Sequence, residues 1–90
     1  MQTKKQREPD VDAQFVGYRI LMLRTHCRLS QDAFAKKIGC MPYLVSNWEA
    51  GKSMLSMKHL LKIADTFGVS LDYFNPKDER PYSTYLAKVK

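Results

Sequence analysis

The stretch GCMPYLVSNWEAGK, residues 39–52, lies between two glycines and contains one proline near its start. Proline loses nothing at the first helical position, so Pro42 predicts the start of a helix, and Gly51 predicts its end. Because successive residues lie about 100° apart around a helix, residues 41–49 form two different faces. The inward face carries Leu44, Val45 and Trp48. The outward face carries Pro42, Tyr43, Ser46, Asn47 and, just beyond the helix, Ala50.

The outward face of this helix has hydrogen-bonding groups and no charge. A helix face that only meets water typically shows Lys and Glu at i,i+4 spacing. The pattern therefore predicts that this face contacts another molecule. The class of that molecule has to follow from the rest of the chain.

The composition describes one basic globular domain. A length of 90 residues fits a single domain. The proportions of hydrophobic residues, 44%, and charged residues, 27%, are typical of a folded chain rather than a disordered one. Fifteen Lys and Arg against nine Asp and Glu give a net charge of +6. This excess favours a polyanionic partner.

The sequence has no signal for a membrane or for secretion. Its longest apolar runs, such as ILML at 20–23, are far shorter than the ~20 residues that span a bilayer. No charged-then-apolar leader opens the chain. We therefore expect a soluble cytoplasmic protein with no membrane partner.

The residues that could carry chemistry do not form a recognisable site. Cys27 and Cys40 are too few for a disulfide framework, so we expect reduced thiols. Together with His26 and His59 they match no known zinc spacing, and we expect no metal and no other cofactor. There is no phosphate-cradling glycine loop, no Gly-x-Ser-x-Gly and no nucleophile–base set. The sequence predicts that the protein is not an enzyme.

Three regions follow one another along the chain. Residues 1–12 are polar and broken by Pro9, which predicts a flexible arm. Residues 13–75 hold the helical patterns and form the predicted domain. Residues 76–90 form a tail that is first charged and then semi-apolar. Its apolar residues fit either a strand, through Tyr85, Ala87 and Val89, or a helix, through Tyr82, Tyr85 and Val89, and periodicity does not decide between them.

Helical patterns precede and follow the opening stretch. The first helix has an apolar stripe and is slightly weakened by Gly17; the stripe is Val16, Ile20, Leu23 and Cys27. The second is capped by Ser30 and ended by Gly39; its inward residues are Phe34, Ala35 and Ile38. The fourth runs from a cap at Ser56 to Gly68; its predicted apolar face is Met57, Leu60, Leu61, Ala64 and Phe67. Ser70 caps a last short turn, LDYF.

No segment reads confidently as a strand, so we predict an all-α fold, a compact bundle of four to five helices. Only Gly39, Cys40 and Met41 connect the second helix to the third, which matches a helix-turn-helix. Over residues 15–74 the chain resembles the Cro/phage-repressor (Xre-type) helix-turn-helix family. The matching features are Leu-Ser-Gln at the second helix, Ala35, Gly39, W-E-x-G-K after the third helix, and L-L-K-I-A with G-V-S-L later. The resemblance implies a lambda-repressor-like fold that binds DNA.

The resemblance also implies roles for individual residues. Positions matching Pro42, Tyr43 and Asn47 contact bases in this family, and the position matching Gln31 grips a phosphate. Ser46 shares the outward face and has base edges within reach. Lys52, after the helix, suits a phosphate contact. The charged residues Arg24 and Glu49 match a structural pair that bridges the first and third helices. The alternatives are plain solvation for Asn47 and Lys52, and packing on the arm or a neighbouring helix for Tyr43.

Three residues depart from the family pattern. Met41 occupies a position that is commonly Ser or Thr, and it can neither cap the helix nor reach a phosphate by a hydroxyl. Pro42 replaces a residue that is often Gln or Arg, so specificity rests on fewer hydrogen bonds to bases or on DNA shape. Arg28 stands where a glycine usually follows the first helix, and a left-handed arginine costs roughly 1 kcal/mol more than glycine.

The sequence therefore predicts a sequence-specific double-stranded DNA-binding transcriptional regulator, a repressor that occupies a promoter, encoded by a bacterium or a phage. One recognition helix contacts only about three to five base pairs, so we expect a homodimer. The candidate dimer surfaces are Leu71, Tyr73 and Phe74, or the tail residues Tyr82, Tyr85, Leu86 and Val89. The tail's alternative is disorder. The alternative function is an antitoxin or adaptor that docks a protein partner through the tail.

Overall fold

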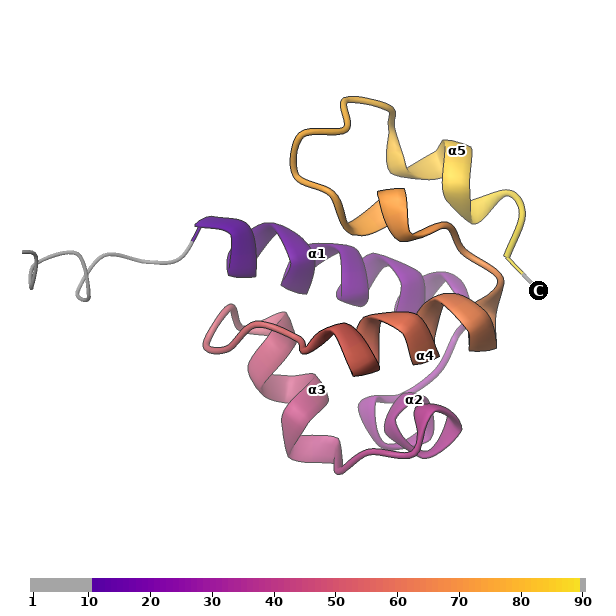
Figure 1. Cartoon of the computed structure of the whole chain (residues 1–90). Coiled ribbons are helices and arrows are strands. Elements are labelled where there is room, and N and C mark those ends of the chain that lie inside the picture. Colours follow the sequence, from indigo (N-terminus) through magenta and orange to yellow (C-terminus); the bar gives the residue numbers. More distant parts are fainter. Residues whose placement is uncertain (1–10, 90) are drawn as a thin grey trace, which may run out of the picture.

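A computed structural model describes residues 11–89 and contains helices but no strand within that range (Figure 1). The elements are α1 (Val11–His26), α2 (Gln31–Ile38), α3 (Pro42–Glu49), α4 (Met57–Phe67), the 3-10 helix η2 (Leu71–Phe74) and α5 (Tyr82–Leu86). In Figure 1, α1 crosses the middle of the molecule, with α2 and α3 on one side and η2 and α5 on the other. Helix α1 contacts α3, η2 and α5, while α2 contacts α3 and α4. The all-α prediction is confirmed.

The N-terminal boundary differs slightly from the prediction. Val11 and Asp12, which the sequence assigned to the arm, already belong to α1. The rest of the predicted arm, residues 1–10, lies outside the described residues. The helical domain therefore starts earlier than residue 13.

The predicted ends of α2, α4 and η2 are formed by the residues that the sequence indicated. Ser30 and Ser56 each accept a hydrogen bond from the backbone N–H three residues on. Ser70 accepts one from the backbone N–H of the second residue of η2. Gly39 and Gly68 adopt φ values of 73° and 72°, the left-handed region that glycine enters without strain.

One core connects all the helices. Val16, Ile20 and Leu23 of α1 are fully buried in it, as the stripe predicted. The Phe34 ring of α2 stacks on the Phe67 ring of α4 with centroids 5.0 Å apart. This contact holds the first helix of the predicted helix-turn-helix against the C-terminal half of the domain.

The predicted apolar face of α4 is partly wrong. Met57 and Leu61 are 61% and 51% exposed, whereas the buried residues of α4 are Ile63 and Phe67. The helical wheel groups all the apolar residues on one side of α4, but α4 packs mainly against α2 and η2, which cover only part of that side. Met57 and Leu61 lie beyond the covered part.

Gly17 has a structural role that propensity alone does not reveal. A Cβ atom at this position would lie 1.9 Å from the carbonyl oxygen of Trp48. The backbones of α1 and α3 therefore touch at Gly17, and no other residue fits there without moving one helix. The sequence predicted only a slightly weaker helix.

Substitution of this glycine separates helix propensity from packing. Propensity alone would make Gly17→Ala more stable by about 0.5–1 kcal/mol. We expect the opposite, a loss of roughly 1–3 kcal/mol, because the methyl group would push α3 away from α1. Urea denaturation followed by circular dichroism measures the difference, with Tyr18→Ala, at an exposed neighbouring position, as the control. A stabilised Gly17→Ala protein would show that the close contact is not maintained.

Part of the C-terminal tail belongs to the core, which corrects the alternative of disorder. Tyr85 and Leu86 are 7% and 5% exposed, and α5 packs on α1. The Tyr85 ring meets the Tyr73 ring edge-on with centroids 5.6 Å apart. Arg80 reinforces the turn before α5, because its guanidinium binds the Asp78 carboxylate at 2.6 Å and lies over Tyr85. Of the strand and helix spacings that the tail sequence fits, the helical one is right.

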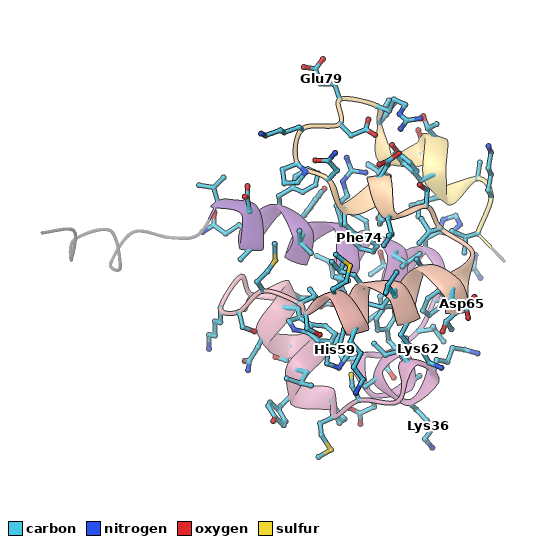
Figure 2. The ribbon with its side chains drawn as sticks, in the orientation of Figure 1. Lys36, His59, Lys62, Asp65, Phe74 and Glu79 are labelled. Atoms are coloured by element: carbon cyan, nitrogen blue, oxygen red, sulfur yellow. The ribbon has the colours of Figure 1, made fainter. Side chains whose placement is uncertain are left out.

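The buried side of η2 closes the same region. The Tyr73 hydroxyl donates a hydrogen bond to the Arg19 carbonyl at 2.7 Å, and burial raises the Tyr73 pKa well above its usual range. Figure 2 shows Phe74 pointing from η2 into the centre of the molecule. Tyr73 and Phe74 are therefore core residues, and this corrects their predicted place on a dimer surface.

Candidate nucleic-acid interface

The turn between α2 and α3 fixes the direction of α3. Gly39 ends α2 in the left-handed conformation, and the Cys40 N–H donates to the Ala35 carbonyl at 3.0 Å. On the inner side of α3, Val45 and Trp48 are 0% and 2% exposed. This anchoring leaves only one possible outward face, the one with no charged residue.

The sequence-predicted reading residues occupy that outward face. Pro42, Tyr43 and Ser46 are exposed and Asn47 is half-buried, while Lys52 is exposed in the loop after α3. Within residues 11–89, none of their side chains takes part in a hydrogen bond or an ion pair. Tyr43 is 60% exposed, so it does not pack into a neighbouring described helix. These groups are available to a ligand.

Gln31 is placed differently from its predicted role. Its side-chain Nε2 donates a hydrogen bond to Glu49 Oε1 at 2.9 Å. The side chain is thereby tied to the end of α3, with one amide N–H left over. Gln31 therefore joins α2 to α3, whatever else it contacts.

Arg24 and Glu49 form a bidentate ion pair between α1 and α3. Arg24 Nε lies 2.6 Å from Glu49 Oε2, and Arg24 Nη2 lies 3.0 Å from Glu49 Oε1. Arg24 Nη1 also donates to the Leu29 carbonyl at 2.9 Å, in the turn before α2. The hydrogen bond with Glu49 raises the Arg24 pKa, so the guanidinium stays charged. With Gln31, the pair connects three helices through one carboxylate.

Breaking this network should destabilise the domain. Arg24→Ala leaves the Glu49 carboxylate, whose side chain is only 8% exposed, without its charged partner. We expect a loss of about 1–3 kcal/mol in the free energy of unfolding. Arg80→Ala is the matched control, because that arginine is 55% exposed and its ion pairs should contribute at most ~1 kcal/mol. Equal losses in chemical denaturation of the two variants would contradict the structural role of the Arg24 network.

His59 supports α3, a role that the sequence did not suggest. It projects from α4 toward α3 (Figure 2), and its ring lies 5.1 Å from the Trp48 ring, centroid to centroid. Its Nδ1 also lies 3.0 Å from the hydroxyl of Ser56. The sequence shows only that His59 lies in the first turn of α4, which does not reveal its contact with Trp48.

The thiols of Cys27 and Cys40 are half-buried. Burial raises the pKa of both Cys27 and Cys40, which keeps the thiols protonated near neutral pH. Across residues 11–89, no group of three or more His, Cys, Asp or Glu side chains is placed to hold a metal ion. Among the described helices, none has the length and apolar character needed to cross a membrane.

Known proteins share this arrangement. A helix-turn-helix family model matches residues 20–74, more than half of the chain. The chain belongs to the Xre-like helix-turn-helix family. It is 36% identical over 70 residues to a Rhodospirillum rubrum protein described as an uncharacterized transcriptional regulator in the ATPase CF(0) region. That match covers 78% of this chain and 64% of the relative, so the chain spans less than two thirds of that protein.

A solved structure extends the likeness to three dimensions. The crystal structure of the restriction-modification controller protein C.AhdI from Aeromonas hydrophila superposes with a TM-score of 0.67. The two chains are 28% identical, and the match covers 72% of this chain and 98% of the other. The predicted family and fold are thereby confirmed. The first relative is described as a transcriptional regulator and the solved neighbour as a controller protein.

Proposed function

We propose that this protein is a sequence-specific repressor that occupies a promoter and reads the DNA major groove with α3. The observation that carries the proposal is the outward face of α3, which is uncharged, unpaired within the described residues and held in place from inside by Val45 and Trp48. A major groove about 12 Å wide admits such a helix. The net charge of +6 supports a polyanionic partner.

The reading residues divide into base-contacting and phosphate-contacting groups. The Asn47 amide can pair with adenine N6 and N7, and Ser46 and the Tyr43 hydroxyl lie on the same face. Lys52 follows α3 and suits a DNA phosphate, as does the remaining amide N–H of Gln31. The two groups predict different responses to mutation.

Asn47→Ala and Lys52→Ala should affect binding in different ways. Asn47→Ala should cost about 1–3 kcal/mol on the best site selected from a random duplex pool, and little on unrelated DNA. Lys52→Ala should weaken binding to both DNAs similarly and reduce the salt slope by about 1. Titrations at several salt concentrations measure both effects. If Asn47→Ala weakens binding to both DNAs equally, Asn47 does not read bases.

Arg28 adds a positive charge beside the start of α2. It is exposed and has a φ of 59°, the left-handed conformation that costs a non-glycine residue roughly 1 kcal/mol. A phosphate contact would offset that cost, and the position of Arg28 three residues before Gln31 supports this assignment. The protein would then grip the DNA backbone on both sides of α3.

The adaptor alternative has less support than the regulator. Of the tail residues that would dock a partner, Tyr85 and Leu86 are buried in the chain's own core, and Tyr82 is exposed. The outward face of α3, in contrast, carries polar groups that are unpaired within the described residues. We therefore propose that the protein, encoded by a bacterium or a phage, acts in the bacterial cytoplasm or nucleoid, bound to DNA.

A homodimer on a palindromic operator would contact enough base pairs to select one site, which a single α3 does not. One α3 contacts about three to five base pairs, too few to select one site among roughly a million. Of the two surfaces considered from the sequence, Leu71 on η2 and Tyr82 on α5 remain exposed, at 40% and 39%. We propose that Leu71 contributes to the dimer contact, with Tyr82 as the competing surface.

Dimerisation is tested by footprinting and by sedimentation equilibrium. The footprint should show two half-sites whose centres lie about 34 Å apart on one face of the duplex. Leu71→Glu should weaken self-association and operator binding together while leaving the circular dichroism spectrum unchanged, and Tyr82→Glu should not. The reverse result would move the contact to α5. Occupation of a single half-site at full affinity by one chain would refute the dimer.

A further inference from the structure

The start of α3 carries exposed apolar groups, among them the ring of Tyr43, that the predicted hydrogen-bonding contacts do not use. We propose that Met41, Pro42 and Tyr43 form a thymine-reading tip, which selects T·A pairs by covering the 5-methyl group of thymine in the major groove. The inference rests on the proposed function, because it requires α3 to enter that groove. It adds the base that the first turn of α3 selects.

The apolar groups of the tip are exposed and adjacent in sequence. Met41 and Tyr43 are 59% and 60% exposed, and Pro42 between them is exposed too. Met41 occupies the N-cap position without forming a side-chain capping hydrogen bond. Single exposed apolar residues are ordinary, but consecutive ones mark a surface for interaction. Here they sit at the end of α3 that enters the groove first.

The base edges differ in what they offer to such a surface. Guanine, cytosine and adenine present donors and acceptors in the major groove, whereas thymine also presents a methyl group. The thioether chain and the pyrrolidine ring of the tip offer no N–H or O–H donor, and Pro42 has no backbone N–H. Covering a cytosine amino group or a guanine carbonyl with them would leave that polar group without a partner. Covering the thymine methyl group removes apolar surface from water.

The tip lies in register with the polar reading residue. Tyr43 and Asn47 are one turn apart on the same face of α3. If Asn47 pairs with an adenine, the tip faces a base pair that neighbours this adenine. The half-site should therefore contain a thymine beside the adenine that Asn47 reads.

Deoxyuridine isolates the methyl group from every other property of thymine. Uracil pairs with adenine as thymine does and lacks only the 5-methyl group. The full-length protein is used to select binding sites from a random duplex pool, and the best site is then prepared with thymidine or deoxyuridine at each selected T. Binding should weaken about fourfold at each position that the tip covers, which corresponds to ~0.8 kcal/mol per buried carbon. Positions outside the tip should show no change.

Two variants assign the effect to the tip. Met41→Ala and Tyr43→Ala should each bring the ratio of thymidine to deoxyuridine affinities closer to one at a tip position. Met57→Ala is the matched control, since Met57 is an equally exposed methionine on α4, and it should leave the ratio unchanged. The ratio is measured within each variant, so a general change in affinity or stability does not imitate the effect.

The outcomes separate this inference from the proposed function. If no sequence is enriched and all duplexes bind alike, sequence-specific reading fails, and the inference fails with it. If a site is enriched but deoxyuridine binds as well as thymidine at every position, the function stands and the thymine-reading tip is wrong. A preference for T·A pairs that survives the change to deoxyuridine would assign the selection to DNA shape instead.

Discussion

The contact between the backbones of α1 and α3 is the constraint on which the reading face depends. A glycine at position 17 lets the Trp48 carbonyl approach so closely that even one methyl group has no room. Because the contact joins two backbones, it fixes the position of α3 more rigidly than side-chain packing alone does. The inner side of α3 is then completed by Trp48, with His59 behind it. The outward residues follow from this placement.

One carboxylate adds the rotational constraint that a backbone contact lacks. Glu49 accepts hydrogen bonds from Arg24 of α1 and from Gln31 of α2. The charged residue of α3 is thus satisfied within the domain, which leaves the outward face neutral. In the proposed DNA complex a neutral face suits base edges, whose donors and acceptors carry no net charge, and the exposed cations around it would meet the phosphates.

The sequence predicts local features well and tertiary ones poorly. Caps at Ser30 and Ser56 and the end of α2 at Gly39 depend on neighbouring residues, and all were predicted. The exposure of Leu61 and the close contact of Gly17 depend on which helix lies opposite, information that periodicity does not contain.

The tail and the outward face of α3 both show where prediction from the sequence stops. Tyr85 has spacing that fits a strand or a helix, and only the presence of α1 and η2 decides that it is helical and buried. The outward face of α3 could be predicted because the same apolar residues that define the helix also define its inner side. The hydrogen bond from Gln31 to Glu49 could not be predicted, since it joins residues eighteen positions apart in different helices.

The unusual start of α3 becomes understandable once its anchoring is considered. A helix normally gains about 1 kcal/mol from a Ser or Thr cap, and Met41 gives up that gain. In an isolated helix of eight residues the loss would matter, because such helices are barely stable in water. Here Gly17, Trp48 and the Glu49 network hold α3 from its middle and its end. The first residues of α3 therefore do not need to stabilise the helix. Their side chains can instead be selected for what they contact outside the protein.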